Sequence, residues 1–373
     1  MIYADNAATT KLDIDAFEAM KPYLLDQYSN ASQPYSFARS AKKALIQARE
    51  TIAACINAEP SEIFFTSGGT EGDNWAIKGM MLHEKTQKVL LTSQIEHHAI
   101  LHAAQAVEEQ GLIVRLLPVT SNGIVSPEVL ESLLTKDTKL VSVMYANNEI
   151  GTIQPIKTLA RIAHDSGSFF HTDAVQAVGH VPIDVKDLDV DMLSSSAHKF
   201  NGPKGIGFLW VKNSTPLKQY IDGGAQENGM RAGTENIASI VGMSVALKKN
   251  CDDMNNTISR LRKLELVLLS ELKRRNIDFI CNGSDNKIPG NISLSFKGFE
   301  GEMLLHRLDL KGICVSTGSA CDSKNTQISH VLTAIKLCKE YALGTIRISL
   351  GRENSEDDVI QIVSAIDSIV NRR

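Results

Sequence analysis

The alternation of two kinds of apolar segment along the first two thirds of the sequence constrains the fold most. Short apolar runs that are typical of buried strands alternate with longer segments in which apolar residues recur at helical spacing. The predicted strands cover residues 63–65, 89–92, 140–145, 168–171, 192–195 and 206–211, and the predicted helices include 37–56, 99–110 and 156–165. This order predicts an α/β fold in which helices wrap a largely parallel sheet.

The pattern changes after Asn236. A long helical stretch rich in Leu, Lys and Glu runs through Arg275, and a separate strand and helix module follows it. The last helix begins with a match to the capping box, in which Ser355 and Asp358 precede an apolar series. A chain of 373 residues is longer than a single core usually supports, so we expect two domains. The predicted boundary lies near residue 250, with residues 16–250 forming the large domain and residues 1–15 and 251–373 the small one.

The overall charge and composition exclude several classes of protein. A formal net charge of -4 and a pI near 6.2 lack the basic footprint of a nucleic-acid-binding domain. No apolar run approaches the length of a membrane span, and the N-terminus lacks the features of a secretory signal, so a cytoplasmic location without a membrane partner is expected. The six cysteines show no CxxC pair and no metal-ligand spacing, which favours reduced thiols and predicts no metal site. Chemistry on a small molecule is therefore the class that composition favours.

A lysine and an aspartate stand directly after two of the predicted strands. Lys199 comes shortly after the predicted strand 192–195, and Asp173 comes shortly after the predicted strand 168–171. Because ligands of such sheets bind at the carboxyl ends of strands, both side chains should face one crevice. A partly desolvated lysine can lose its proton and form a Schiff base, and a carboxylate can keep a pyridine nitrogen protonated. Taken alone, Lys199 could also be a solvated surface lysine and Asp173 a helix N-cap.

Residues 66–71 join the predicted strand 63–65 to a helix. Gly69 and Thr70 can present backbone amides and a hydroxyl to an anion at the start of this helix. The segment is not a Walker P-loop, because no Lys-Ser or Lys-Thr pair follows its last glycine. It predicts a phosphate-binding loop of another kind.

Taken in order, these motifs resemble those of the cysteine desulfurases of the NifS and IscS kind, which are fold-type I, class V pyridoxal-phosphate enzymes. The similarity runs nearly end to end. It rests on residues 3–10, 66–71, 96–98, 147–151, 173–176, 196–199, 231–234, 316–321 and 346–351. The resemblance implies a large domain with a mostly parallel seven-stranded sheet wrapped by helices, a smaller α+β domain, and pyridoxal 5'-phosphate as the cofactor.

The resemblance also implies roles around the cofactor ring. Lys199 would carry the cofactor, Asp173 would bind the pyridine nitrogen, and Gln176 would hydrogen-bond the phenolic oxygen. His97 would stack on the ring and exchange a proton with the substrate thiol. Without the resemblance, His97 would be read as a partly buried structural histidine.

Two further groups of residues would bind the phosphate and the substrate. The phosphate ligands would be Gly69, Thr70, Ser196 and His198, joined by Thr234 from the second subunit of a homodimer. Asn148 and Arg347 would orient the carboxylate of the substrate L-cysteine, which suits the bidentate fork of arginine. On its own, Arg347 would be read as a surface cation on a strand.

Cys321 selects the reaction that the resemblance implies. Its neighbours are small and polar, so it is predicted to lie in a loop, where an exposed thiol can ionise, whereas Cys314 stands between apolar neighbours. Cys321 would take the sulfur of L-cysteine as a persulfide and release L-alanine. The sulfur would then pass to an acceptor protein for iron-sulfur cluster assembly or tRNA thiolation. Selenocysteine lyase activity and a class V aminotransferase, which needs no cysteine, remain the alternatives.

The segment 30–35 lacks a proline that is usual in the motifs of this family. Three single residues also depart from these motifs. Tyr35 replaces a histidine, Ala225 replaces the third glycine of a Gly-Gly-Gly-Gln-Glu run, and Lys336 stands where a glycine is common. The chain stops at Arg373, so the tail through which longer relatives engage the iron-sulfur scaffold is expected to be missing. The identity of the acceptor is therefore left open by the sequence.

Overall fold

Seven strands form the large sheet of the computed structural model, which describes residues 1–82, 87–317 and 328–371. The order across the sheet is β2-β8-β7-β6-β5-β3-β4. The strands are β2 (Ile63–Thr66), β3 (Val89–Ser93), β4 (Ile113–Leu117), β5 (Thr138–Ser142), β6 (Phe169–Asp173), β7 (Met192–Ser196) and β8 (Gly207–Val211). Neighbours from β7 to β4 are parallel, while β8 runs antiparallel to both β7 and β2. The prediction of a mostly parallel seven-stranded sheet is confirmed.

Two strands differ from the sequence-based expectation. β5 ends at Ser142, although residues 143–145 were predicted to continue it; the backbone amides of Val143 and Tyr145 still bond to carbonyl oxygens of β6. β4 was not predicted at all. It is an edge strand whose residues are mostly exposed, so it lacks the buried apolar run that marks the central strands.

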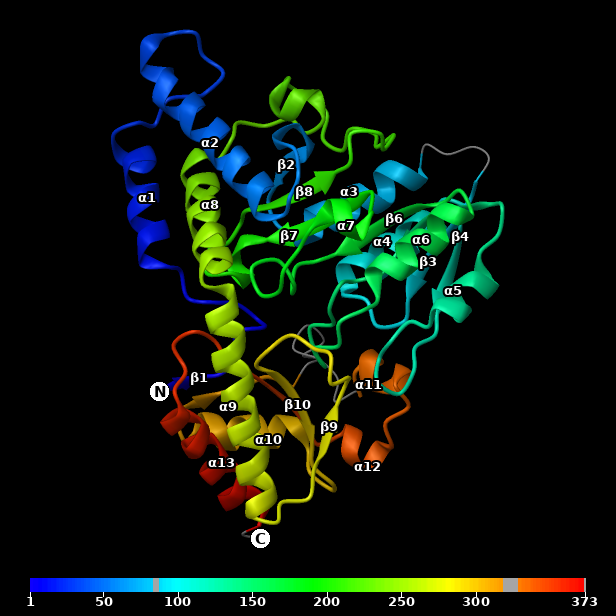
Figure 1. Ribbon diagram of the computed structural model, residues 1–373, viewed down its shortest axis with the longest axis vertical. Helices are drawn as coiled ribbons and strands as arrows, with labels where there is room; N and C mark the ends of the chain where they lie inside the picture. The colour runs from blue at the N-terminus through cyan, green and yellow to red at the C-terminus, as the bar shows by residue number, and fades with distance from the viewer. Residues whose placement is uncertain (83–86, 318–327, 372–373) are drawn as a thin grey trace.

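Helices cover both faces of this sheet (Figure 1). Leu90 and Leu91, adjacent in β3, point to opposite faces and belong to two different apolar clusters. One face packs against α3 (Gly69–Met81) and α4 (His98–Glu108). The other carries α1 (Ile14–Leu25), α2 (Arg39–Cys55), α5 (Pro127–Leu133), α6 (Ile156–Asp165), α7 (Val185–Leu188) and α8 (Ile237–Asp252).

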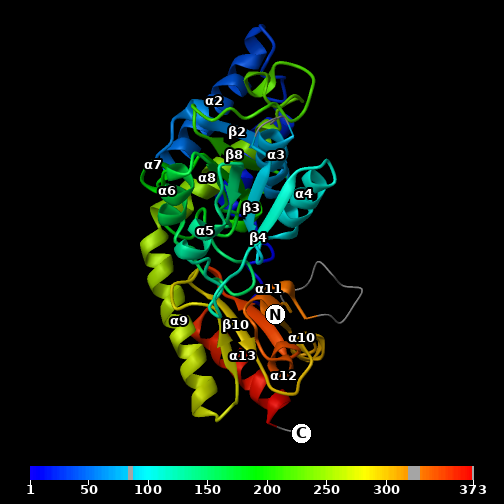
Figure 2. The same cartoon turned by 90° about the vertical axis from the view of Figure 1, so that its right-hand side faces the viewer.

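A smaller layer lies beside one end of the large sheet (Figure 2). Its antiparallel sheet has the order β12-β10-β9, and β1 pairs in parallel with β11. The elements are β1 (Ile2–Tyr3), β9 (Ile280–Asn282), β10 (Asn291–Ser295), β11 (Ile313–Cys314), β12 (Thr345–Ser349), α9 (Met254–Arg274), α10 (Gly301–Asp309), α11 (His330–Ala334), α12 (Lys339–Ala342) and α13 (Glu356–Val370). Side chains from α9, β12 and α13 form a second apolar core, which includes Leu268, Ile346 and Ile366. The capping box predicted at Ser355 and Asp358 opens α13.

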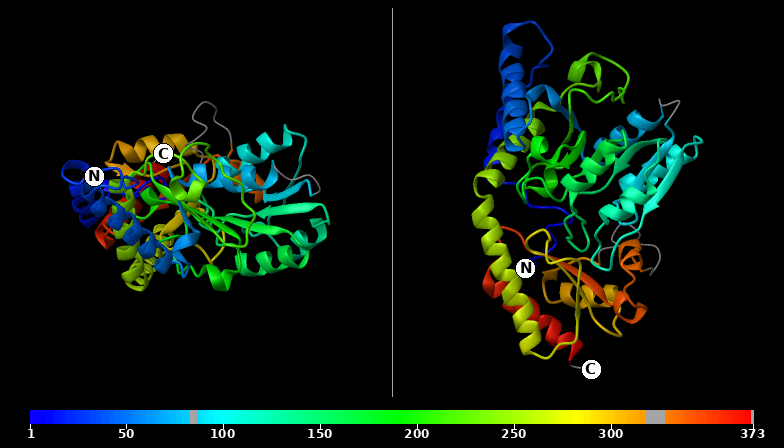
Figure 3. Two further views of the ribbon diagram at one scale, coloured as in Figure 1. Left: turned by 90° about the horizontal axis from the view of Figure 1, so that it is seen from above. Right: turned by 45° about the vertical axis from the view of Figure 1, so that its right-hand side comes forward.

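The predicted helix from Asn236 to Arg275 is two helices. α8 ends at Asp252 and α9 begins at Met254, and they run along the edge of both layers (Figure 3). The Asp253 carboxylate accepts bonds from the side chains of Asn256 and Thr257, which fixes the start of α9. α8 packs on α1 and α2, and α9 packs on α13, so we propose that the domain boundary lies at this break. No helix of the described residues is long and apolar enough to cross a membrane.

Candidate active site

A cavity of about 600 Å³ opens at the carboxyl ends of the parallel strands, between the large sheet and β12. Ten of the predicted site residues line it, namely Gly69, Thr70, His97, Asn148, Asp173, Gln176, Ser196, His198, Lys199 and Arg347. Thr234 lines a neighbouring hollow instead. Cys321 falls in the segment 318–327, outside the described residues. Ser316, close to the start of that segment, lies in the cavity wall.

Lys199 lies directly beyond the end of β7. The strand ends at Ser196, and a single turn of 3-10 helix, Ala197–Lys199, carries the side chain into the cavity wall. Its Nζ donates hydrogen bonds to the carbonyl oxygens of Ala7 at 2.6 Å and Ala8 at 2.8 Å. The sequence assigned no role to these alanines, because a backbone carbonyl leaves no signal in the residue type.

Asp173 is the last residue of β6, and its carboxylate accepts a bond from the Val175 amide at 2.9 Å. Burial raises the pKa of Asp173 to about 6, although the bond from Val175 and the charge of Lys199 oppose the shift. A cation placed beside this carboxylate would favour its ionised form. Gln176 donates from Nε2 to the Ala7 oxygen at 3.0 Å, so it meets Lys199 at the same N-terminal segment.

The predicted anion loop joins β2 to α3. Gly68 has φ +151°, which a residue with a side chain rarely adopts, and it precedes the helix without any side-chain cap. A Cβ atom on Gly69 would lie 2.5 Å from Val175 Cγ2, so glycine alone lets the start of α3 come this close to the turn after β6. The first amides of α3 therefore face the cavity and suit an anion.

His198 lines the same cavity, and its Nδ1 lies 3.1 Å from Thr9 Oγ1. Burial, together with the charges of Lys199 and Lys204, lowers the pKa of His198 to about 4. His198 is thus neutral near pH 7, and it can bind an anion as a hydrogen-bond donor rather than as a charge.

His97 is the N-cap of α4, and its Nδ1 accepts the Ala99 amide hydrogen at 3.1 Å. Burial and the nearby charge of Lys199 lower the pKa of His97 to about 4. The ring is therefore neutral near pH 7, and because Nδ1 is an acceptor the proton lies on Nε2. Sequence reasoning could not fix this protonation state.

Arg347, in the middle of β12, reaches the cavity from the small layer. Its Nη1 donates to the backbone carbonyl oxygen of Asn148 at 2.9 Å, and its Nη2 donates to Asp5 Oδ1 at 2.7 Å. Its buried Nε has no hydrogen-bond partner among the described residues. A buried N–H without a partner is costly, so a carboxylate bound beside Arg347 would gain a donor that the protein leaves unused.

Two further buried acids, to which the sequence analysis gave no role, lie near Asp173. Asp73 lines the cavity, and its Oδ1 lacks a hydrogen-bond partner within the described part of the chain, with His171 Nε2 at 3.8 Å. Glu96 is fully buried, and its Oε1 accepts bonds from Ser93 Oγ at 2.6 Å and the Met144 amide at 2.9 Å. Burial raises the pKa of Glu96 to about 8. The motif around His97 contained Glu96, but the sequence could not show that it is buried.

Replacing Glu96 with Gln should change how stability depends on pH. The pKa of Glu96 is about 8 in the folded protein and 4.5 for an ordinary glutamate. The contribution of protonated Glu96 to the free energy of unfolding is therefore fully present below pH 4.5 and is lost as the pH rises through 8. Gln imitates the protonated form at every pH. Relative to the unsubstituted protein, E96Q should therefore gain about 2 kcal/mol between about pH 6 and about pH 8 in denaturant unfolding. Glu302→Gln, at an exposed position of α10, is the control; an equal pH response of the two variants would contradict the prediction.

Thr234 is exposed and lines a hollow of about 220 Å³ together with Arg231 and Glu227. Ser67 and Gly205 belong to the walls of both this hollow and the large cavity. Of the three departures from the family pattern, Lys336 has φ +59°, a conformation that favours glycine, and Tyr35 is half exposed.

The comparisons with known proteins agree along the whole chain. The family model for class-V aminotransferases matches residues 2–362. A cysteine desulfurase IscS of Clostridium botulinum is 46% identical over all of this chain and 95% of its own length. A solved structure described as a NifS-like protein has a TM-score of 0.94 and 36% identity, with both chains covered completely. A structure of SspA in complex with cysteine has a TM-score of 0.84 and 35% identity, covering 94% of this chain and 99% of that one.

Proposed function

This chain belongs to the class-V aminotransferase family, and we propose that its cavity binds pyridoxal phosphate on Lys199 and presents L-cysteine to it. The chain is a cysteine desulfurase, as the names of relatives that match its full length indicate. The observation that carries the proposed site is the meeting of Lys199, Asp173, the α3 helix start and Arg347 around one cavity.

The residues present fit this cofactor at its aldehyde, its pyridine nitrogen and its phosphate. Lys199 offers a primary amine, and Asp173 offers a buried carboxylate that a protonated pyridine nitrogen would satisfy. The start of α3, which has no side-chain cap among the described residues, offers backbone amides to the phosphate, and Ser196 and His198 line the same cavity. When bound, pyridoxal phosphate supplies an electron sink for the carbanion formed at the substrate Cα. The residues named here would hold its charged ends.

Side chains of the protein would bind the substrate carboxylate and transfer its protons. Arg347 and Asn148 would bind the cysteine carboxylate, which fixes the side of the substrate that faces Lys199. Lys199, once released from the cofactor, would take the proton from Cα. His97 presents Nε2–H, so it would donate to the substrate sulfur rather than accept from it.

Cys321 would receive the sulfur. Its thiolate would attack the sulfur of the bound substrate, the Cβ–S bond would break, and alanine would leave with the persulfide remaining on Cys321. The structure of SspA bound to cysteine, at 35% identity, supports cysteine as the substrate class. An acceptor protein that presents a thiol would remove the persulfide sulfur.

The test of this function is product stoichiometry. Purified protein loaded with pyridoxal phosphate and given L-cysteine and a thiol reductant should release alanine and sulfide in equal amounts. Alanine without sulfide would contradict desulfuration. Pyruvate with sulfide would indicate β-elimination instead.

We propose that the protein works as a homodimer in which Thr234 completes the phosphate site of the partner. Thr234 is exposed and does not line the cavity of its own chain as far as the structure describes it. Large apolar side chains are exposed on α1 and between α1 and α2, namely Ile14, Phe17, Leu24, Leu25, Tyr28, Tyr35 and Phe37. A surface of this kind favours contact with a second copy.

Mixed dimers can assign Thr234 to one subunit or the other. Thr234→Ala should weaken cofactor binding by about 1.5 kcal/mol, roughly tenfold, through the loss of one hydrogen bond to an anion. A heterodimer pairs one Thr234→Ala chain with one Lys199→Ala chain. If Thr234 acts across the interface, both substitutions fall in the same site and the other site is intact. Activity at limiting cofactor should then be half that of the unsubstituted dimer. Half the activity of the T234A homodimer would show that Thr234 serves its own chain.

A further inference from the structure

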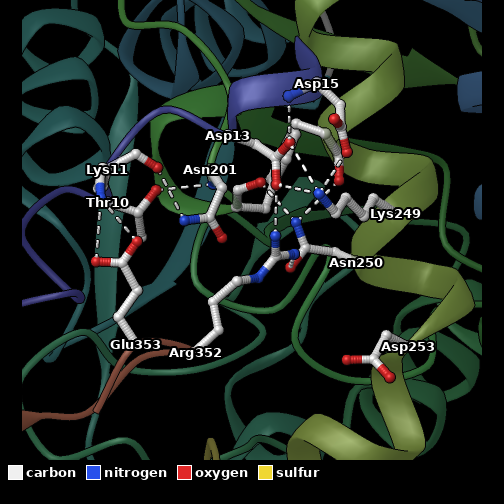
Figure 4. A network of polar contacts seen from close by, with 12 residues as sticks. Thr10, Lys11, Asp13, Asp15, Asn201, Lys249, Asn250, Asp253, Arg352 and Glu353 are labelled. Carbon is white, nitrogen blue, oxygen red and sulfur yellow. Dashed lines mark hydrogen bonds and ion pairs between the residues drawn. The ribbon is translucent and has the colours of Figure 1, made fainter. Parts of the chain in front are cut away.

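A network of polar contacts joins the turn after β12 to the segment that follows Lys199 (Figure 4). The guanidinium of Arg352 donates from Nη1 to Asp13 Oδ2 at 2.7 Å and from Nη2 to Asn250 Oδ1 at 2.8 Å. Asp13 caps α1 and Asn250 lies in α8, so three distant parts of the sequence meet at one side chain. Arg352 lies in the turn directly after β12, the strand that carries Arg347.

Both partners of Arg352 continue to the backbone beside Lys199. The backbone amide of Asp13 donates to the backbone carbonyl oxygen of Asn201 at 2.9 Å. Asn250 Nδ2 donates to the Phe200 oxygen at 2.6 Å. The two residues after Lys199 are thus tied, through Asp13 and Asn250, to the turn that follows the strand of Arg347.

Asp13 is the charged centre of this network. Its side chain is 6% exposed, and it also accepts bonds from Lys249 Nζ and the Asp15 amide. Burial alone would raise the pKa of Asp13, but the hydrogen bonds from Lys249 and Asp15 and the charges of Lys249 and Arg352 outweigh it and lower the pKa. Asp13 therefore stays ionised with its charge satisfied.

A second ion pair crosses between the same two segments and offers a contrast. Lys11 and Glu353 lie 2.9 Å apart, but their side chains are 73% and 69% exposed. Breaking a largely buried, hydrogen-bonded pair is strongly unfavourable, whereas an exposed pair contributes little. The Asp13–Arg352 pair can therefore hold a geometry that the Lys11–Glu353 pair cannot.

We propose that Arg352 is a positioning residue which, through Asp13 and Asn250, holds Lys199 in register with Arg347. The proposal rests on the function given above, in which Arg347 binds the substrate carboxylate and Lys199 takes the Cα proton. These two groups come from different layers of the fold, and a displacement of about 1 Å between reacting groups can lower a rate by about a hundredfold. A tie between the two segments is what prevents such a displacement.

The test compares Arg352→Gln with Glu353→Gln, its exposed neighbour, in protein loaded with pyridoxal phosphate. Per lysine-bound cofactor, kcat for L-cysteine should fall at least about tenfold in R352Q, while KM changes less than about threefold because Arg347 is intact. E353Q should leave both constants unchanged. In cofactor-free R352Q, hydrogen exchange of a peptide covering residues 196–203 should also accelerate relative to E353Q.

A merely structural role for Arg352 would give another result. R352Q would then lose thermal stability and load less cofactor, but kcat per loaded site would equal that of E353Q, and this outcome would overturn the proposal. Asn250→Ala removes the contacts of Asn250 to Phe200 and to Arg352 but leaves the Asp13–Arg352 pair. It should therefore give an intermediate kcat, and it covers the case in which R352Q does not fold. If the unsubstituted protein and E353Q both released no sulfide, the proposed function would fail, while hydrogen exchange would still test the tie.

Discussion

Lys199→Ala should reduce cysteine turnover at least about a thousandfold, because the variant loses both the amine that carries the cofactor and the base that takes the Cα proton. The absorbance band of a lysine-bound cofactor should disappear as well. Measurement of sulfide release and of this band on the same sample checks both consequences. The expected effect is large because both roles belong to one atom, Nζ, which the carbonyls of Ala7 and Ala8 hold in the cavity.

Lys204 provides the matched control for Lys199. It also lines the cavity, but its side chain is exposed and it lies in the turn that precedes β8. Lys204→Ala should keep the band and most of the activity. A band that survives in K199A, or that vanishes in K204A, would move the cofactor to another lysine and remove the assignment of Lys199.

The large sheet could be predicted because its central strands are buried on both faces. Strands such as β3 and β7 read as short apolar or small-residue runs, and the polar residues that end them mark one edge of the sheet. β4 was not predicted because most of its residues are exposed at the edge of the sheet. The break between α8 and α9 escaped because helical periodicity continues across Asp253, where side-chain bonds rather than composition end one helix and begin the next.

The site could be predicted as far as function resides in side chains within recognisable motifs. Ten residues placed by motif line one cavity. The sequence could not predict the contacts between segments. These include the carbonyls that bind Lys199, the Nε of Arg347 that has no partner among the described residues, and the buried carboxyl of Asp73. Asp73 stands in the middle of α3 between Gly72 and Asn74, where nothing distinguishes it from a solvated helix residue until the packing of the helix is known.

Cys321→Ser should abolish sulfide release while leaving cofactor binding intact. The thiol of cysteine has an ordinary pKa of about 8.5 and can provide a thiolate, whereas a serine hydroxyl does not ionise near neutral pH, so no nucleophile remains for the substrate sulfur. Binding of the cofactor and of cysteine depends on Lys199, Asp173 and Arg347, which the substitution does not alter. The variant should therefore change its absorbance when cysteine is added and yet release neither sulfide nor alanine above background.

The control for Cys321 is Cys338, an exposed cysteine at the start of α12. Cys338→Ser should keep full turnover, which separates loss of one particular thiol from loss of any reactive thiol. Stability should change by less than about 0.5 kcal/mol in C321S, because the small polar neighbours of Cys321 in the sequence predict an exposed site. If C321S released sulfide at the unsubstituted rate, Cys321 would not be the sulfur acceptor. Because an aminotransferase or a β-lyase shares Lys199 and Asp173 but needs no cysteine, that result would favour one of those reactions instead.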